Sequence, residues 1–329
     1  MAHECEKIFL VFSCNLNNIH IQCVCVHKYT TNKAVAWPMR KELLRLCKEH
    51  EGKNTRRERK EKIMRRFVRV FSAVLCLVCT TNVYAARNEA KPYNWYCCHV
   101  KDGTQPSCDA EMQFIKEYNG YYMDSSHTEP NAPEKVIYLT FDAGYENGNI
   151  EKILNTLKEE NVPGAFFVLE NLVVKNPELI KRMANEGHLV CNHTAKHHDM
   201  TKYHSAEAFL DELRRLETVC DESAGVTVAR YYRPPEGRFT EENLRFANDA
   251  GYKTIFWSFG YVDWDNERQM SPDDALDKIL GGLHNGEVLL LHPTSATNAE
   301  IMKRLITELK DRGYRFGTLD ELTATESNG

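Results

Sequence analysis

The sequence predicts an α/β fold built around a mainly parallel sheet. Short apolar runs typical of buried strands alternate with amphipathic helical stretches, and glycines stand where the chain turns back from helix to strand. The apolar runs span residues 136–141, 164–169, 188–191, 229–233, 253–259 and 287–291. Such an alternation gives a sheet that is either open or closed into a barrel.

The stretches between the runs show helical spacing and helix boundaries. In "IEKILNTLKEE" and "AFLDELRRLETVC" the apolar residues recur on one face. Ser271-Pro272 predicts a helix start, with a cap residue followed by proline at the first helical position. Four glycines occupy positions where a left-handed C-terminal cap is expected: Gly187, Gly225, Gly251 and Gly313.

Charge and cysteine are both distributed unevenly along the chain. The net charge is −5, but residues 1–70 carry 16 Lys and Arg against 7 Asp and Glu, so the remainder carries −14. An acidic main body lacks the basic face that a nucleic-acid partner requires, so we expect no such partner. Nine of the twelve cysteines fall within the first 98 residues, without the paired CxxC motifs of a zinc module. Beyond residue 134 only Cys191 and Cys220 remain, and we expect both to be buried thiols.

Residues 64–85 have the organisation of a signal peptide. Three arginines precede the apolar stretch 70–79, and "VYA" at 83–85 offers a small-residue cleavage site. The alternative is an uncleaved membrane anchor over residues 67–86. We interpret residues 1–63 as an upstream extension outside the fold, with translation starting at Met64; a cytoplasmic basic tail is the alternative.

The remainder of the chain divides into a lead-in and a main domain. Residues 86–133 form an aromatic-rich lead-in that ends in a polar, proline-containing linker. Residues 134–325 hold the regular alternation of strands and helices and form the main domain.

Ionisable side chains follow five of the apolar runs. They are Asp142, His193, Arg233, Asp263 and His292. The carboxyl ends of parallel strands meet at one edge of a sheet, so we expect these side chains to lie close together. Polar groups at a buried sheet edge are costly unless they are paired or used, and five together predict a functional site.

His193 and His197 are the candidate metal ligands. Their i, i+4 spacing places both imidazoles on one face of a helical turn, where they can ligate one divalent ion. The neighbouring His198 would point elsewhere. A solvated, histidine-rich loop is the alternative that the spacing leaves open.

Five blocks in a fixed order resemble the polysaccharide deacetylases of carbohydrate esterase family 4, the NodB-homology fold. The blocks are "TFDAGYENG", "HTAKH", "RPPEG", "YVDW" and "LLLH". The likeness covers roughly residues 134–325, which would make this part the catalytic domain. "FWSFGYVDW" and "LHPTSATNAEI" are most similar to the spore-cortex branch, the delta-lactam-biosynthetic N-acetylmuramic acid deacetylases. The resemblance implies a distorted (β/α) barrel with fewer than eight regular strands.

The resemblance also implies roles for the strand-end residues. Asp142 matches the general base of the family and Arg233 the arginine that pairs with it. His292 matches the general acid, and Asp263 the carboxylate that orients and charges this imidazole. A metal on the two candidate histidines would polarise the N-acetyl carbonyl and activate a water molecule. Three further residues would shape the sugar groove, with core packing as the alternative for the last of them: Pro234, Pro235 and Trp264.

One position departs from the family pattern. The second aspartate of the first motif, a metal ligand in the family, is here Ala143. The muramic acid branch also departs at this position, so the resemblance implies a branch feature rather than lost activity. Zinc suits two imidazoles, and manganese, cobalt and magnesium are the alternatives. Glu146 is a candidate substitute ligand or substrate contact, the alternative being a solvated loop carboxylate.

The resemblance implies a metal-dependent hydrolase that removes N-acetyl groups from peptidoglycan amino sugars, and the likeness to the spore-cortex branch favours N-acetylmuramic acid on the route to muramic δ-lactam. The predicted signal peptide indicates that the enzyme is exported. Its partners would be peptidoglycan glycan strands, with functional dependence on an N-acetylmuramoyl-L-alanine amidase. Contact with the membrane would come only through the signal or an uncleaved anchor. The location would be the cell envelope or the extracellular space, and in a sporulating cell the forespore intermembrane space. The alternatives are deacetylation of N-acetylglucosamine or chitooligosaccharides, and a non-catalytic glycan-binding module.

Overall fold

The computed structural model describes residues 64, 90–98, 100–127 and 132–325. The chain divides into two compact units, residues 1–86 and 87–329, and the description concerns the second. The predicted extension over residues 1–63, and the predicted signal peptide apart from Met64, lie outside the described residues. Within the described ranges, no helix has both the length and the apolar character needed to cross a membrane.

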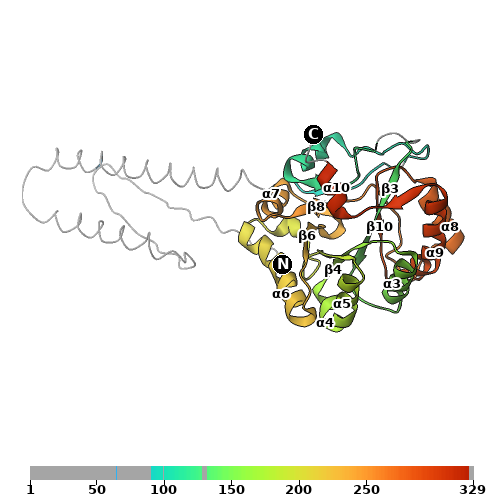
Figure 1. Cartoon of the computed structure of the whole chain (residues 1–329). Helices are drawn as coiled ribbons and strands as arrows, with labels where there is room; N and C mark the ends of the chain where they lie inside the picture. The colour runs from blue at the N-terminus through green and yellow to red at the C-terminus, as the bar shows by residue number, and fades with distance from the viewer. Residues whose placement is uncertain (1–63, 65–89, 99, 128–131, 326–329) are drawn as a thin grey trace, which may run out of the picture. The chain divides into compact units, whose positions relative to one another are not determined.

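A curled parallel sheet forms the centre of the second unit (Figure 1). Among the described residues its strands run in the order β2-β8-β6-β5-β4-β3-β10-β9, and β11 pairs with β3. Seven of these strands have three residues or more, which confirms the predicted barrel with fewer than eight regular strands. The strands are β2 Gly120–Tyr121, β3 Lys135–Ala143, β4 Ala165–Val168, β5 Leu189–Asn192, β6 Ala229–Tyr232, β8 Lys253–Ile255, β9 Phe259–Gly260, β10 Glu287–Leu291 and β11 Tyr314–Phe316.

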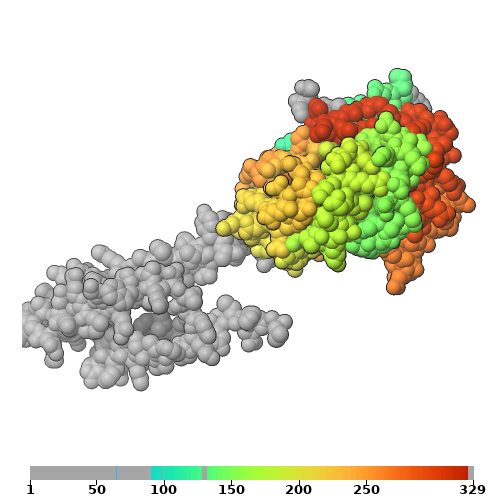
Figure 2. All heavy atoms as spheres, turned by 60° about the horizontal axis from the view of Figure 1, so that its bottom comes forward, coloured from blue at the N-terminus to red at the C-terminus, as the bar shows by residue number. Residues whose placement is uncertain are grey.

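Except for the last helix, which packs against the interior face, helices lie on the outer side of the sheet (Figure 1), and Figure 2 shows one face of this covering, where side chains form a continuous surface. The helices are α3 Asn149–Glu160, α4 Glu170–Lys175, α5 Pro177–Asn185, α6 Ala206–Ala224, α7 Glu241–Asp249, α8 Pro272–Gly281, α9 Ala296–Asp311 and α10 Leu319–Thr325. Short 3₁₀ helices are η1 Ala110–Tyr118, η2 Met200–Lys202 and η3 Pro235–Gly237.

The helix boundaries predicted from the sequence are confirmed. The hydroxyl of Ser271 accepts a hydrogen bond from the backbone N–H of Asp274, and Pro272 is the first residue of α8. The four predicted cap glycines all have left-handed φ angles of 84°, 63°, 80° and 82°: Gly187, Gly225, Gly251 and Gly313. The two thiols predicted to be buried, those of Cys191 and Cys220, are fully buried and free.

Side chains of β3 alternate between two cores. From Ile137 to Phe141 the odd-numbered residues pack beneath the outer helices. Val136 and Tyr138 pack inside the barrel with α10. Because successive side chains of a strand point to opposite faces, Asp142 belongs to the interior face, at the carboxyl end of the strand.

The described part of the lead-in is built into the same folded unit. β1 (Tyr93–Asn94) pairs antiparallel with β7 (Arg238–Phe239), and β2 joins the main sheet beside β8. Trp95 stacks on Phe256 with ring centroids 4.4 Å apart. Its indole N–H donates a hydrogen bond of 2.9 Å to the carbonyl of Trp257. The lead-in therefore buries one edge of the barrel.

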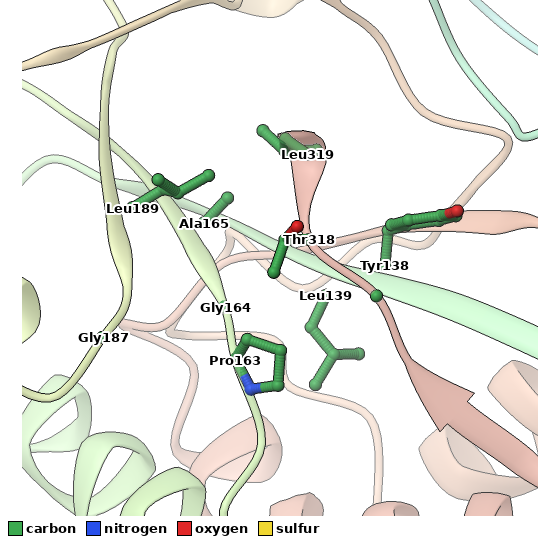
Figure 3. Close-up of a pocket in the computed structure, with 10 residues that line it drawn as sticks. Tyr138, Leu139, Pro163, Gly164, Ala165, Gly187, Leu189, Thr318 and Leu319 are labelled. Carbon is green, nitrogen blue, oxygen red and sulfur yellow. The ribbon is translucent and has the colours of Figure 1, made fainter. Parts of the chain in front are cut away.

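A small pocket lies at the amino ends of β4 and β5, away from the strand-end residues (Figure 3). Pro163, Gly187 and Thr318 are among the residues that line it. Its cavity volume of about 10 Å³ has room for one water molecule at most. A sugar ring does not fit there, so this pocket is not a glycan site.

We expect Trp95→Ala to lower the free energy of unfolding by about 3–5 kcal/mol, the usual cost of truncating a large aromatic side chain in a core. Trp95 is 5% exposed and would leave a cavity against Phe256. Tyr96→Ala is the matched control, because that side chain is 52% exposed; its effect should stay within about 0.5 kcal/mol. Urea denaturation followed by circular dichroism measures both. Equal losses in the two variants would contradict a structural role for the lead-in.

Candidate active site

Strand register brings the strand-end residues to one rim of the barrel. The last paired residues of β10 and β3 are followed directly by His292 beside Asp142. The last paired residues of β5 and β6 are followed by His193 beside Arg233. The four side chains come from segments far apart in the chain, and parallel pairing aligns them at the carboxyl edge.

Arg233 is fully buried and holds Asp142 in place. Its Nη1 donates to Oδ1 of Asp142 at 2.8 Å. Its Nε donates to the carbonyl of Ile255 at 3.0 Å, and its Nη2 donates to Oγ1 of Thr140 at 2.9 Å and to the carbonyl of Phe256 at 3.1 Å. These bonds fix the plane of the guanidinium and so the orientation of the carboxylate beside it.

The carboxylate of Asp142 is kept ionised. Burial by itself would raise the pKa of Asp142, but the charge of Arg233, with smaller effects of the two neighbouring histidines and of the hydrogen bond from Arg233, outweighs burial and leaves the pKa below its usual range. Oδ1 is occupied by the arginine, whereas Oδ2 lies 3.6 Å from Nε2 of His193. The second oxygen therefore faces the candidate metal ligands.

The hydrogen bonding of His193 suits a metal ligand. Its Nδ1 lies 2.9 Å from the carbonyl oxygen of Arg233. A carbonyl only accepts, so Nδ1 carries the proton and Nε2 keeps a lone pair. Burial lowers the pKa of His193 to about 4, so the imidazole is neutral at physiological pH. The ring of His197 lies next to it, with centroids 5.0 Å apart.

The helical turn predicted for these histidines is wrong. The segment is a loop, in which Thr194 and His197 have left-handed φ angles of 70° and 57°. The backbone N–H of His197 donates to Oγ1 of Thr194 at 3.0 Å, which closes the loop and brings its ring beside His193. The i, i+4 spacing is compatible with a helical turn and with a closed loop, so it does not determine the backbone conformation. Nδ1 of His198 lies 2.8 Å from the hydroxyl of Tyr203, outside the pair as expected.

His292 is held by Asp263 on the other side of the rim. Nδ1 of His292 donates to Oδ1 of Asp263 at 2.6 Å, and the backbone N–H of His292 donates to Oδ2 at 2.7 Å. Burial by itself would lower the pKa of His292, but the hydrogen bond and charge of Asp263 outweigh it, so the pKa is raised. Strand pairing places His292 beside Asp142 at the carboxyl edge, and the charge of Asp142 contributes to the raised pKa of His292.

Asn298 is a site residue that the sequence analysis missed. Its Nδ2 donates to Oδ2 of Asp263 at 2.6 Å and to the carbonyl of His292 at 3.1 Å. Its Oδ1 accepts from the hydroxyl of Tyr261. In the sequence, Asn298 is only a polar residue six positions after His292, in the first turn of the helix α9. A residue of that kind cannot be distinguished there from an ordinary helix-capping residue.

Three of the residues predicted to contact substrate differ in their exposure and in their contacts. Trp264 is 57% exposed, with its ring centroid 5.7 Å from that of His292, so the core-packing alternative is wrong. Pro235 is buried and begins η3 just after Arg233. Glu146 accepts from the backbone N–H of Gly148 before α3, and burial raises its pKa. In the described structure no hydrogen bond or ion pair joins Glu146 to the two histidines.

The described residues supply only some of the ligands that a metal ion at this site would need. Among the described residues, no three His, Cys, Asp or Glu side chains are arranged as a complete metal site. Ala143 is fully buried at the end of β3 and offers no donor. His193 and His197 fit as two ligands of a divalent ion, since both are imidazoles and the first is held neutral. Water or substrate would supply the remaining ligands.

Comparison with known proteins agrees with this geometry. Residues 129–255 match the family described as Polysaccharide deacetylase. The peptidoglycan-N-acetylmuramic acid deacetylase PdaA of Bacillus subtilis (strain 168) is 37% identical over 256 residues, which are 75% of this chain and 95% of the relative. The chain belongs to the polysaccharide deacetylase family. It is therefore a hydrolase that acts on amide bonds, in a family that is generally metal-dependent.

A solved structure of PdaA and one further deacetylase show how far the likeness extends. The structure of Bacillus subtilis PdaA, a family 4 carbohydrate esterase, has a TM-score of 0.66 at 36% identity and covers 72% of this chain and 98% of that chain. The peptidoglycan-N-acetylglucosamine deacetylase PgdA of Listeria monocytogenes is 34% identical over 208 residues, 62% of this chain and 43% of the relative. The fold and the family expected from the sequence blocks are confirmed.

We expect His193→Ala and His197→Ala each to weaken zinc binding by more than about 100-fold, since loss of an outer-shell contact alone costs 10–100-fold. With two histidine ligands, each variant keeps a single imidazole. His198→Ala is the matched control, because His198 is bonded to Tyr203. Calorimetric titration with zinc, and metal content after dialysis, measure all three. Unchanged affinity in either ligand variant would remove that histidine from the site.

Proposed function

We propose that this polysaccharide deacetylase removes the N-acetyl group from N-acetylmuramic acid residues of peptidoglycan. The observation that carries deacetylation is the pair of ionic contacts at one rim, Arg233 with Asp142 and Asp263 with His292. They lower the pKa of the carboxyl group that serves as base and raise the pKa of the imidazole that serves as acid. The choice of muramic acid is supported by the greater coverage of the likeness to PdaA than to PgdA.

Asp142 acts as the general base in this proposal. Its Oδ2, the oxygen that Arg233 leaves open, accepts a proton from the water molecule that attacks the acetyl carbonyl carbon. The lowered pKa ensures that the carboxylate is ionised at neutral pH. Arg233 stays charged throughout and keeps the accepting oxygen in one place.

His292 acts as the general acid when the C–N bond breaks. Its Nδ1 is committed to Asp263, so Nε2 is the atom that donates a proton to the departing nitrogen. The products are acetate and the free amine of the sugar. The raised pKa keeps the imidazole protonated closer to neutral pH, where a general acid is most effective.

A divalent ion, zinc by ligand preference, would be held by His193 and His197 and would supply positive charge to the acetyl carbonyl oxygen. Trp264 offers an exposed aromatic face beside His292, suited to the apolar side of a sugar ring. Pro235 is buried two residues after Arg233, so it would act on the substrate by shaping the turn that follows this arginine. The carboxylate of Glu146 accepts a hydrogen bond from the backbone N–H of Gly148, just before α3. A contact with substrate would require the carboxylate to give up this bond.

The setting of the reaction follows from its substrate. Peptidoglycan lies outside the cytoplasmic membrane, so the chain would act in the cell envelope after export by the segment 64–85, in a sporulating cell between the forespore membranes. The freed amine can close on the lactyl carboxyl group of muramic acid only where no stem peptide occupies that carboxyl. An N-acetylmuramoyl-L-alanine amidase would therefore act first.

Two alternative functions have weaker support. Deacetylation of N-acetylglucosamine would use the same acid and base, and the likeness to PgdA is its support. A non-catalytic glycan-binding module would account for Ala143, but binding alone requires neither the buried Asp142–Arg233 pair nor the contact of His292 with Asp263.

We expect the metal-loaded chain to release acetate from peptidoglycan freed of stem peptides, from the muramic residues alone, and to leave a chitin oligomer unchanged. A chelator should abolish the release. Asp142→Asn should lower kcat by about 10²–10⁴-fold with glycan binding retained. Asp265→Asn is the matched control, because Asp265 pairs with the exposed Arg268. Product mass identifies the sugar.

Two other outcomes of this experiment would contradict different parts of the proposal. Release from the chitin oligomer instead would keep the chemistry and exclude the muramic assignment. Binding of both glycans without turnover, by protein shown to contain metal, would favour the binding module.

We expect Asp263→Asn to move the alkaline limb of kcat/KM to lower pH by roughly one unit or more. Asp263 raises the pKa of His292, so the imidazolium persists to higher pH in the wild type and loses its proton earlier in the variant. The pH profile of acetate release measures the shift, with Asp265→Asn as control. A lower kcat with an unmoved limb would limit Asp263 to a structural role.

A further inference from the structure

Two cysteines of the lead-in face each other at a distance from the active site. Cys97 and Cys108 are partners in an antiparallel β-bridge. Residues directly opposite each other in such a bridge have Cα atoms about 4.5–5.5 Å apart. A disulfide requires Cα atoms about 4.4–6.8 Å apart. The backbone spacing therefore already suits a covalent bond between the two side chains.

The side chains of this pair share one environment. Cys108 is buried in the lead-in core, and Cys97 packs against the same core. The hydroxyl of Tyr122 contacts the Cys108 thiol, and each sulfur lies near enough to this hydroxyl to raise the pKa of Tyr122, after the larger effect of burial. The sulfurs also influence each other electrostatically. Cys98 is exposed, as alternation along an extended segment requires.

We propose that Cys97 and Cys108 form a disulfide bond when the chain meets a disulfide oxidant. The thiolate of one cysteine attacks the oxidant, whose S–S bond breaks, and the second cysteine then displaces the oxidant from this mixed disulfide. One S–S bond is formed and one is broken. The two protein thiols are oxidised, and the oxidant leaves as two thiols that carry the two protons. The predicted signal peptide would deliver the lead-in to an oxidising compartment.

Burial also determines when the bond forms. It raises the pKa of both Cys97 and Cys108, so the folded, reduced protein contains little of the thiolate that attacks a disulfide. The bond therefore forms most readily during folding, before Tyr122 and the lead-in core cover the pair.

The bond would stabilise a segment that supports the active site. Trp95, two residues before Cys97, donates from its backbone N–H to the carbonyl of Gly237 at 2.8 Å. Gly237 belongs to the short 3₁₀ helix that follows Arg233. Its positive φ of 65° and the closeness of Trp95 and Trp257 leave no room for a Cβ atom there. Closing the loop between the two cysteines would keep Trp95 against this turn.

The test is to refold the full chain in oxidised glutathione, alkylate the remaining thiols and digest with trypsin without reduction. We expect the peptide of residues 88–101 to be linked to that of residues 102–116, with Cys98 alkylated. Cys98→Ser should keep the link, whereas Cys97→Ser and Cys108→Ser should abolish it. Alkylation of all three cysteines, or a link through Cys98 in the unmutated chain, would overturn the proposal.

Stability provides a second readout that does not depend on the variants folding equally well. Adding reductant should lower the Tm of the oxidised wild-type chain by roughly 5 °C, as expected for a loop of about a dozen residues in a domain of this size. The same fall should occur in Cys98→Ser and be absent in Cys97→Ser. An unchanged Tm in the wild type on reduction would overturn the stabilising role.

Discussion

The buried ion pair between Arg233 and Asp142 is the interaction on which the rest of the site depends. A guanidinium with no exposed surface is tolerated only because a carboxylate and several carbonyl and hydroxyl oxygens surround it. The same arginine presents its backbone carbonyl to Nδ1 of His193, which sets the tautomer of that imidazole. One residue thus fixes the charge of the candidate base and the free nitrogen of a candidate metal ligand.

On the opposite side of the rim the roles of the charged groups are reversed, because a buried carboxylate holds a basic side chain in place. Asp263 is almost fully buried and accepts from the ring and the backbone of His292 and from Asn298. Three donors fix the position of this carboxylate, and its contact with the imidazole raises the pKa of His292. Two buried acid–base contacts thus move the pKa values of Asp142 and His292 apart, the arrangement that lets one site offer both a base and an acid near neutral pH.

The candidate metal ligands rest on less support than the acid and the base. Ala143 at the end of β3 offers no donor, and among the described residues no third His, Cys, Asp or Glu completes a metal site with the two imidazoles. His197 is exposed and has a left-handed backbone, which a non-glycine residue adopts at some energetic cost. The bond from its N–H to Thr194 compensates part of that cost. The lead-in acts on the turn after Arg233, where the backbone N–H of Trp95 donates to the carbonyl of Gly237.

The sequence by itself determined the parallel α/β class, the helix boundaries and the five ionisable residues of the rim, because these follow from local patterns: strand periodicity, cap residues and polar groups after apolar runs. The closure of the sheet into a barrel was expected only from the family resemblance. Only the tertiary structure decided what those patterns leave open. The spacing of His193 and His197 fits a helical turn and a closed loop equally well, and the hydrogen bond that selects the loop is invisible in the pattern. The contacts of Asn298 with Asp263 and of Trp95 with Trp257 join segments far apart in the chain. Which of these segments meet depends on strand register and loop path, and neither is encoded in any short stretch of residues.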